Sequence, residues 1–119
     1  MLNLDLVKKA ATRIDSVVVK TPFAHAPLLS AISEADVLVK KENLQVTGAF
    51  KLRGAFNKVA SLSPEERAKG VIAASAGNHA QGVAFAAKHF NATAVIVMPE
   101  STPLTKINGV TSHGAEVVL

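Results

Sequence analysis

Two short segments of the sequence contain residue types that can do chemistry. In the first, residues 46–55, a lysine is predicted to lie one turn into a helix that opens after a Thr47-Gly48 corner, at Lys51. In the second, residues 75–82, serine, asparagine and histidine surround Gly77. A lysine amine that is partly shielded from water can attack a carbonyl group and form an imine. We predict that the two segments face one pocket and that Lys51 is its reactive group; the alternative is an ordinary solvated lysine on a helix surface.

The second segment lies between a short apolar run and a helical pattern. Ligands of open parallel sheets bind outside the carboxyl ends of the strands, and unpaired N–H groups at a helix start attract carboxylates and phosphates. Gly77 allows the backbone to approach a ligand closely, and polar side chains are added by Ser75, Asn78 and Gln81. The segment therefore predicts an anion site; the alternative is a capped strand-to-helix turn, in which the same residue types are common.

Other kinds of site have little support in the sequence. Gly77 and Gly82 have the separation of a P-loop, but Val83 and Ala84 stand where phosphate binding requires Lys and Ser or Thr. The glycine spacing of a dinucleotide-binding fingerprint is also missing. The acid close to the lysine segment, Glu42, has no carboxylate partner for acid–base work. The histidines lack metal-ligand spacing, so no metal site is expected, and three of them are predicted to be structural or surface groups: His25, His89 and His113.

Composition narrows the class of protein. Apolar residues make up 49% of the 119 residues and charged residues 18%, which is typical of a folded domain. No apolar run is long enough for a bilayer, no secretion signal opens the chain and no cysteine is present, so a soluble cytoplasmic protein is expected. The net charge of +4 is scattered and neither Tyr nor Trp occurs, so we expect no nucleic-acid partner. A pocket for small anions accounts for the basic balance equally well.

Hydrophobic periodicity and cap residues predict the elements that must position the two segments. Helices are predicted from a cap at Asn3 or Asp5 to residue 14, at residues 49–61, between Ser63 and Gly70, at residues 79–89, and after residue 103 to about residue 113. Buried-type strands are predicted at residues 71–74, 92–98 and 115–119, and shorter strands at residues 17–19, 27–30 and 36–41, the last two joined by a turn. The regular alternation from residue 71 onward predicts an α/β fold, in which an open parallel sheet carries helices on both faces.

Residues 40–55, KKENLQVTGAFKLRGA, resemble the cofactor-lysine segment of the threonine dehydratases. Residues 75–84, SAGNHAQGVA, resemble the asparagine loop of that family, and MPESTPLTK and GAEVVL resemble later segments of it. The family belongs to the fold-type II pyridoxal-phosphate enzymes, which include serine racemase, threonine synthase and cysteine synthase. The resemblance implies a tryptophan-synthase-β-like fold with pyridoxal 5'-phosphate as cofactor. It also implies a lyase that dehydrates and deaminates L-threonine, and L-serine, to a 2-oxo acid and ammonia, in isoleucine biosynthesis or threonine catabolism.

The same resemblance implies a role for each residue of the two segments. Lys51 would hold the cofactor covalently and, once released, move protons at the substrate Cα, while Phe50 would pack beside the pyridine ring. Asn78 would hydrogen-bond the 3-hydroxyl of the cofactor. The substrate, a small amino acid, would bind its carboxylate in the loop formed by Ser75, Ala76, Gly77, Asn78 and His79. Serine racemase has a second, proton-carrying serine where this chain has Ala76, so the resemblance implies elimination and not racemisation.

The resemblance covers nearly the whole chain but not the whole family fold. The glycine-rich phosphate loop of the family, and the residue that meets the pyridine nitrogen, have no counterpart in residues 1–119. We therefore expect an N-terminal portion of a catalytic domain, in which residues 1–50 begin the large domain and residues 51–119 form part of the small domain. Such a portion is expected to have little or no activity by itself, and the full-length protein to be a homo-oligomer. The alternatives are another family member such as serine racemase, a non-catalytic remnant, or a generic anion-binding α/β module.

Overall fold

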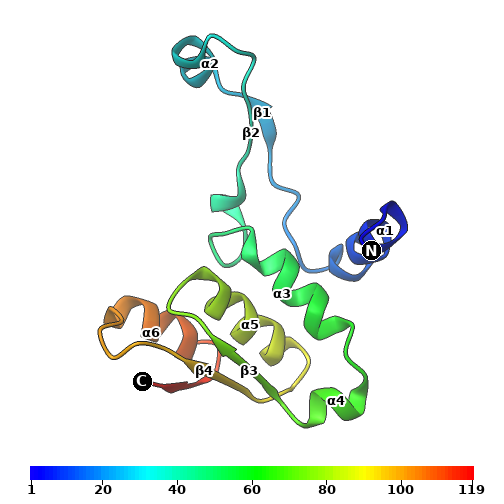
Figure 1. Ribbon diagram of the computed structural model, residues 1–119, viewed down its shortest axis with the longest axis vertical. Helices are drawn as coiled ribbons and strands as arrows, with labels where there is room; N and C mark the ends of the chain where they lie inside the picture. The colour runs from blue at the N-terminus through cyan, green and yellow to red at the C-terminus, as the bar shows by residue number, and fades with distance from the viewer.

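The computed structural model describes residues 1–119 and contains two separate sheets. β3 (Val71–Ala74), β4 (Ala94–Val97) and β5 (Glu116–Val118) form a parallel sheet in the order β3-β4-β5. An antiparallel pair of strands projects from the body that contains this sheet (Figure 1). The predicted parallel sheet is therefore confirmed, although its second and third strands are shorter than predicted.

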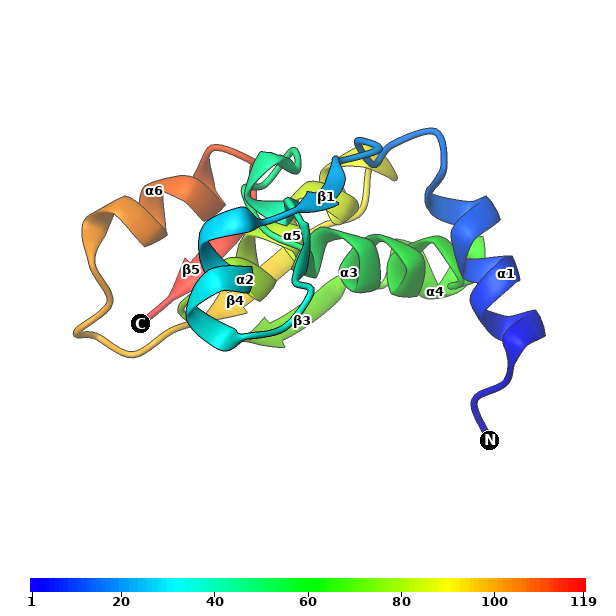
Figure 2. The same ribbon diagram turned by 90° about the horizontal axis from the view of Figure 1, so that it is seen from above.

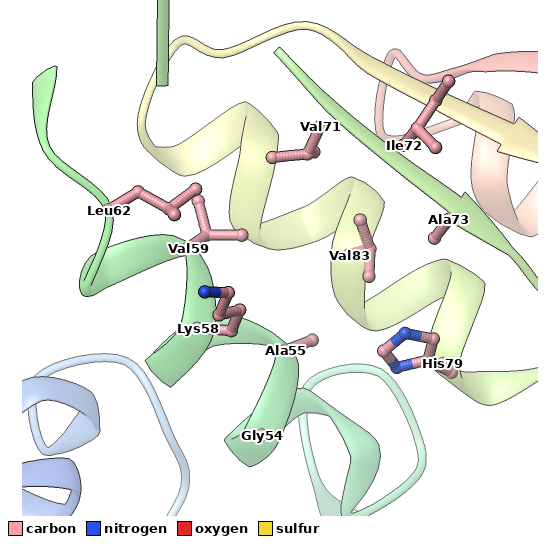
Figure 3. Close-up of a pocket in the computed structure, with 10 residues that line it drawn as sticks. All are labelled: Gly54, Ala55, Lys58, Val59, Leu62, Val71, Ile72, Ala73, His79 and Val83. Atoms are coloured by element: carbon pink, nitrogen blue, oxygen red, sulfur yellow. The ribbon is translucent and has the colours of Figure 1, made fainter. Parts of the chain in front are cut away.

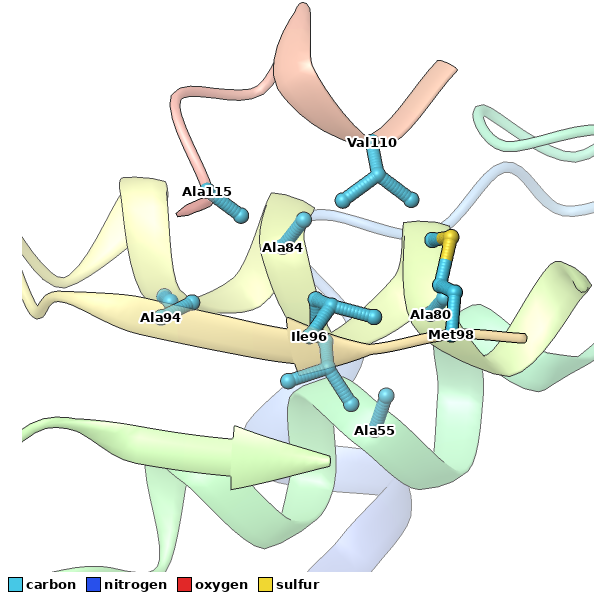
Figure 4. Close-up of a cluster of buried hydrophobic side chains, with 10 residues drawn as sticks. Ala55, Ala80, Ala84, Ala94, Ile96, Met98, Val110 and Ala115 are labelled. Atoms are coloured by element: carbon cyan, nitrogen blue, oxygen red, sulfur yellow. The ribbon is translucent and has the colours of Figure 1, made fainter. Parts of the chain in front are cut away.

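Two helices, α5 (Asn78–His89) and α6 (Leu104–Thr111), connect the three parallel strands and cover one face of their sheet. The core beneath them consists mainly of small side chains, which let the helices lie close to the strands: Ala80, Ala84, Ala94, Ile96, Met98 and Val110 (Figure 4). On the opposite face Ile72, Val97 and Val118 are exposed. Residues 1–119 thus provide helical cover on one face of the sheet, whereas the sequence predicts cover on both faces.

α3 (Lys51–Ala60) packs along α5, and α1 (Leu4–Ile14) packs against α3 (Figure 2). These contacts form a second apolar cluster, which contains Ile14, Leu52, Phe56, Val59 and Ala86. The cluster buries one side of α3 completely, while its other side remains accessible at the first turn. The first turn of α3 is therefore packed against the core on one side and accessible to solvent on the other.

Two helix starts agree with the capping residues predicted from the sequence. The side-chain oxygen of Asn3 accepts a hydrogen bond of 3.0 Å from the N–H of Leu6 in α1. α4 (Pro64–Ala68) begins with a capping box, in which Ser63 and Glu66 each accept a bond from the other's backbone N–H. Such caps satisfy N–H groups that the helix itself leaves unpaired. None of the helices in the structure is both long and apolar enough to cross a membrane.

The antiparallel pair consists of β1 (Phe23–His25) and β2 (Leu38–Lys40), which are connected by α2 (Pro27–Ser33). The predicted strand at residues 27–30 is therefore wrong, because this segment is helical. Pro27 occupies the first position of the helix, where its missing N–H has no intrahelical partner to lose. A short apolar run does not by itself distinguish a strand from a helix.

The predicted strand at residues 17–19 is also wrong. The N–H groups of the first two valines both bond to the carbonyl oxygen of Ile14, each at 3.0 Å, and so continue the end of α1 as a turn. Val19 finds its partner not in a strand but in the side chain of Gln45, with which it exchanges two hydrogen bonds. A short 3-10 helix, η1 (Glu42–Leu44), leads from β2 toward α3 and precedes that glutamine.

Candidate active site

α3 begins at Lys51, directly after a tight corner of the backbone. Gly48 has a φ of +70°, a conformation that favours glycine, and its N–H bonds to the carbonyl oxygen of Gln45 at 2.8 Å. Phe50 precedes the helix and provides no side-chain cap. Because the corner extends to Phe50, Lys51 is the first residue of the helix; the prediction that it lies one turn into the helix is wrong.

The amine of Lys51 lies at the open side of this helix start. Its nitrogen, Nζ, lies 5.0 Å from the centre of the Phe50 ring, which is close enough for a cation–π attraction. Phe50 is itself 59% exposed, whereas Leu52 on the opposite side of the helix is fully buried. Lys51 is exposed. The partial shielding from water that the sequence predicts for its amine is therefore not provided by residues 1–119.

A pocket of about 310 Å³ opens beside Lys51 and brings the two predicted segments together. Its walls come from the first turn of α3 and from one residue of the second segment, and they are Phe50, Lys51, Arg53, Gly54, Ala55 and His79. A second, more apolar pocket of about 270 Å³ adjoins it and shares Gly54, Ala55 and His79. Figure 3 shows His79 and Leu62 at opposite ends of this second pocket. Of the predicted site residues in the second segment, His79 lines these two pockets, whereas Ser75, Ala76, Gly77 and Asn78 do not.

Gly82 explains how α5 comes so close to Lys51. A Cβ atom at Gly82 would lie 3.2 Å from the Cβ of Ala55 and 3.3 Å from the carbonyl oxygen of Lys51. Even a methyl group would force the two helices apart by a few tenths of an ångström, so the observed separation depends on glycine. The glycine thus places the start of α5, and with it His79, next to the first turn of α3.

The loop between β3 and α5 ends in a helix start that has no side-chain cap. The hydroxyl oxygen of Ser75 accepts a bond of 3.3 Å from the N–H of Gly77 and does not reach further into the helix. Three backbone N–H groups have no acceptor within the protein, those of Asn78, His79 and Ala80. They point out of the positive end of a twelve-residue helix, so they can hold a carboxylate or a phosphate.

The remaining side chains of this loop differ in their surroundings. Three of the predicted site residues are half-buried, namely Ser75, Ala76 and Gly77, and two are exposed, namely Asn78 and His79. Gln81 lies against α6, because its Nε2 atom is only 2.9 Å from the place where a Cβ of Gly109 would be. Gln81 therefore does not line the pocket beside Lys51.

The other three histidines have structural contacts, as predicted. His25 lies 3.0 Å from the hydroxyl of Ser30 and 3.3 Å from the carboxylate of Asp36, at the end of β1. His89 packs edge-on against two aromatic rings, those of Phe56 and Phe90. The ring of His113 packs edge-on against Phe85, and burial, with a smaller contribution from the charge of Lys88, lowers the pKa of His113.

Sequence reasoning does not find the polar cluster around Glu42. The carboxylate of Glu42 accepts bonds of 2.8 Å and 2.9 Å from two nitrogens of Arg53. Hydrogen bonds from Arg53 lower the pKa of Glu42 to about 2, with smaller contributions from Thr21 and Gln45, although burial opposes the shift. The same ion pair raises the pKa of Arg53. The two residues are 11 positions apart and separated by the corner, so no local spacing rule signals the pair.

The protein has an α/β fold in which an exposed amine and an uncapped helix start meet at one pocket, at the end of a parallel strand where ligands of such folds bind. Residues 14–119 match the family described as pyridoxal-phosphate dependent enzyme, and the chain belongs to this family. It is 50% identical to the L-threonine ammonia-lyase of Thermotoga maritima over 119 residues, which cover 100% of this chain and 30% of that protein. It is 46% identical to an L-threonine dehydratase, catabolic TdcB, of Staphylococcus aureus over 120 residues, which cover 100% of this chain and 35% of that protein. The chain thus spans about a third of the length of these curated relatives.

The fold is also similar to that of solved enzymes. The crystal structure of serine racemase from Dictyostelium discoideum matches with a TM-score of 0.92 and 38% sequence identity, over 98% of this chain and 38% of that chain. The predicted pyridoxal-phosphate enzyme fold is therefore confirmed. Residues 1–119 thus correspond to 38% of the serine racemase chain.

The polar groups beside Lys51 fit pyridoxal phosphate. The hydroxyl of Thr47 is buried and has no hydrogen-bond partner, and such an orphaned group costs about 1–3 kcal/mol unless a ligand satisfies it. Thr47 lies in the corner that leads into α3, four residues before Lys51, although it is not among the residues that line the pocket. A primary amine is the group that reacts with an aldehyde, and the free N–H groups of α5 suit an anion. The chain's own donors therefore agree with the cofactor of the family.

Proposed function

We propose that the protein containing this chain is a threonine dehydratase, an ammonia-lyase that converts L-threonine, and L-serine, to a 2-oxo acid and ammonia. The observation that carries the proposal is the meeting of Lys51 and His79 at one pocket, next to the unpaired N–H groups at the start of α5. An α-amino acid needs both groups, since its carboxylate requires an anion site and its Cα requires a base. The proposal is supported by relatives that are named L-threonine ammonia-lyase and L-threonine dehydratase. The proposal concerns the full-length protein. The curated relatives are about three times as long as this chain.

The residues of the first segment would serve the cofactor. When bound, pyridoxal phosphate supplies an electron sink for the charge that develops at the substrate Cα. Lys51 would hold it through its amine and, once free, take the proton from Cα as a general base. Phe50, which is exposed beside this amine, would lie against the pyridine ring. Asn78, exposed at the start of α5, would donate a hydrogen bond to the ring hydroxyl.

The residues of the second segment would serve the substrate. The free N–H groups at the start of α5 would bind the carboxylate, with the loop residues around them: Ser75, Ala76, Gly77, Asn78 and His79. A carboxylate held there would orient Cα toward Lys51, because His79 and the lysine line the same pocket. Removal of the Cα proton and of the β-hydroxyl as water leaves an enamine. Its hydrolysis gives the 2-oxo acid and ammonia.

The division of the chain into two parts belongs to the same proposal. Residues 1–50 would begin the large domain and residues 51–119 would form part of the small domain. This is supported by the two separate sheets and by the way the antiparallel pair projects from the body (Figure 1). We further propose a cytoplasmic homo-oligomer, on the basis of the metabolic relatives alone. Residues 1–119 by themselves would have little activity, since they leave the amine of Lys51 exposed.

The test uses the full-length gene product that contains this chain. Pyridoxal phosphate is added, the adduct is trapped with borohydride, and the labelled peptide is identified by mass spectrometry. We expect a single stable label on Lys51, together with release of 2-oxobutyrate and ammonia from L-threonine. Lys51→Ala should abolish both. Lys69→Ala removes an exposed lysine outside the site and should change neither. An unlabelled Lys51, or turnover that survives Lys51→Ala, would contradict the proposal.

A racemase is the second candidate, because the chain is structurally similar to serine racemase. Ala76 argues against it, since an alanine cannot carry a proton on the face of Cα opposite to Lys51. We expect the protein to form no D-serine from L-serine, and Ala76→Ser to produce measurable D-serine while 2-oxo acid formation continues. The measurement is chiral chromatography of the reaction mixture. D-serine from the unchanged protein, or none from Ala76→Ser, would show that Ala76 does not decide between the two reactions.

A further inference from the structure

Glu42 lies where three separate parts of the chain meet. Its carboxylate accepts two hydrogen bonds from Arg53 in α3, at 2.8 Å and 2.9 Å. It also accepts a bond of 2.5 Å from the hydroxyl of Thr21, which lies before β1, and a longer one of 3.5 Å from Gln45, just after η1. One carboxylate thus connects the segment that follows α1, the segment that follows β2, and the first turn of α3.

Burial and multiple hydrogen bonds restrict the conformation of the Glu42 carboxylate and its partners. The side chain of Glu42 is 14% exposed and that of Arg53 is 31% exposed, so the carboxylate is mostly shielded from water while the guanidinium is partly solvated. A guanidinium that donates two parallel bonds to a carboxylate fixes the direction of both groups. Thr21 and Gln45, which complete the cluster, are 4% and 5% exposed. A network of this kind is satisfied at nearly every polar atom, so it holds one geometry.

The hydrogen-bond network around Glu42 fixes the first turn of α3, which carries Lys51. Arg53 is two residues beyond Lys51, in the same first turn of α3, and lines the same pocket. On the other side of the corner, the carbonyl oxygen of Gln45 accepts the N–H of Gly48 at 2.8 Å. The corner is therefore held both before and after the residues that turn the chain toward Lys51.

Glu42 is unsuited to a direct part in proton transfer. Its pKa is about 2, so at neutral pH it is a very weak base. Its oxygens are already occupied by three side chains, and it does not line the pocket beside Lys51. Any effect of Glu42 on chemistry must pass through the elements that it connects.

We propose that Glu42 is a positioning residue, which fixes the first turn of α3 through Arg53 and so directs the amine of Lys51 toward the carbonyl group of the cofactor. This inference rests on the proposed function and adds to it a residue that contacts neither cofactor nor substrate. The ion pair also connects the part of the chain before residue 51 to the part after it. Alignment of the two parts would therefore depend on the same bond as the direction of the lysine.

The test compares the rate at which Lys51 is labelled in the full-length protein. Glu42→Gln keeps the shape of the side chain and one acceptor oxygen but removes the charge. We expect borohydride-trapped label on Lys51 to form about tenfold more slowly, with a lower kcat for L-threonine and a nearly unchanged KM. Glu116→Gln, which alters an exposed carboxylate on β5, should leave the labelling rate unchanged.

Arg53 provides the second half of the experiment. Arg53→Lys keeps the charge but cannot donate two parallel bonds, so we expect a labelling rate between those of Glu42→Gln and the unchanged protein. The double variant Glu42→Gln with Arg53→Lys should be no slower than the slower of the two single variants, because both changes weaken the same interaction. Arg53→Lys also keeps the test decisive if Glu42→Gln does not fold.

The possible outcomes separate this inference from the proposed function. If the unchanged protein labels Lys51 and the folded variants label it at the same rate, the positioning role is refuted, even if the variants melt at a lower temperature. If the unchanged protein does not label Lys51 at all, the proposed function fails, and the inference fails with it. Slower labelling in folded Glu42→Gln and Arg53→Lys supports both.

Discussion

Replacement of Gly82 by alanine tests whether the close contact between α5 and α3 positions the site. The added methyl group would lie 3.2 Å from the Cβ of Ala55, 3.3 Å from the carbonyl oxygen of Lys51 and 3.4 Å from the Cα of Leu52. Two of these neighbours are backbone atoms, so they cannot rotate away. The helices must separate by a few tenths of an ångström at the turn that carries the lysine.

The magnitude follows from two opposing contributions. Alanine in a helix interior is more favourable than glycine by about 1 kcal/mol, whereas overpacking a close contact costs about 1–3 kcal/mol. We therefore expect Gly82→Ala to destabilise the protein by up to about 2 kcal/mol. Gly54 on α3 is the matched control, because a Cβ there has no neighbour within 4 Å. Gly54→Ala should keep the full gain of about 1 kcal/mol.

The assay is urea denaturation of the full-length protein and of both variants at one temperature and pH. The expected result is a lower midpoint for Gly82→Ala and a higher one for Gly54→Ala, with equal slopes. Labelling of Lys51 by pyridoxal phosphate should also be slower in Gly82→Ala, since His79 is displaced together with the start of α5. A midpoint for Gly82→Ala that equals or exceeds that of Gly54→Ala would falsify the argument from close packing.

Three further predictions concern polar groups. The ion pair lowers the pKa of Glu42 from 4.5 to about 2, so its contribution to stability is complete above pH 4.5 and is lost as the pH falls toward 2. The full shift corresponds to about 3 kcal/mol, which solvent screening reduces to about 1–2 kcal/mol. The difference in urea midpoint between the unchanged protein and Glu42→Gln should therefore shrink between pH 5 and pH 3. A constant difference would contradict the stabilising role of the Glu42–Arg53 pair. Thr47→Val removes a buried hydroxyl that has no partner, so the cofactor-free protein should be as stable as the unchanged protein or more stable. If the hydroxyl contacts the cofactor, pyridoxal phosphate should bind about two- to tenfold more weakly, as measured by an absorbance titration. Unchanged affinity would exclude that contact. Ser63→Ala removes one half of the capping box of α4 and should cost about 1 kcal/mol in thermal unfolding, without any effect on the labelling of Lys51, whereas an altered labelling rate would show that α4 and the site are coupled.

Local signals in the sequence were sufficient for the parallel part of the fold. The three strands of the sheet and the helices between them follow from apolar runs and helical spacing, and Asn3 and Ser63 cap helices as expected. These features depend on residues within one or two turns of each other. The same reasoning fails at residues 17–19 and 27–30, where short apolar runs fit a strand and a helix equally well. At residues 17–19 a tertiary contact takes part, because Val19 bonds to the side chain of Gln45. At residues 27–30 the proline at the start of α2 is a local helix signal, which the strand prediction did not use.

The sequence by itself determined which groups are present in the site: the amine of Lys51, the glycine corner before it, and a polar loop that leads into a helix. Only the tertiary structure decided how these groups meet. Gly82 appears in the sequence as a possible phosphate-loop glycine, but in the structure it sets the distance between α5 and the turn of Lys51. Glu42 appears as an isolated acid, but in the structure it connects that turn to two distant segments. Helix starts and strand periods depend on neighbouring residues, whereas these contacts depend on the path of the chain between them.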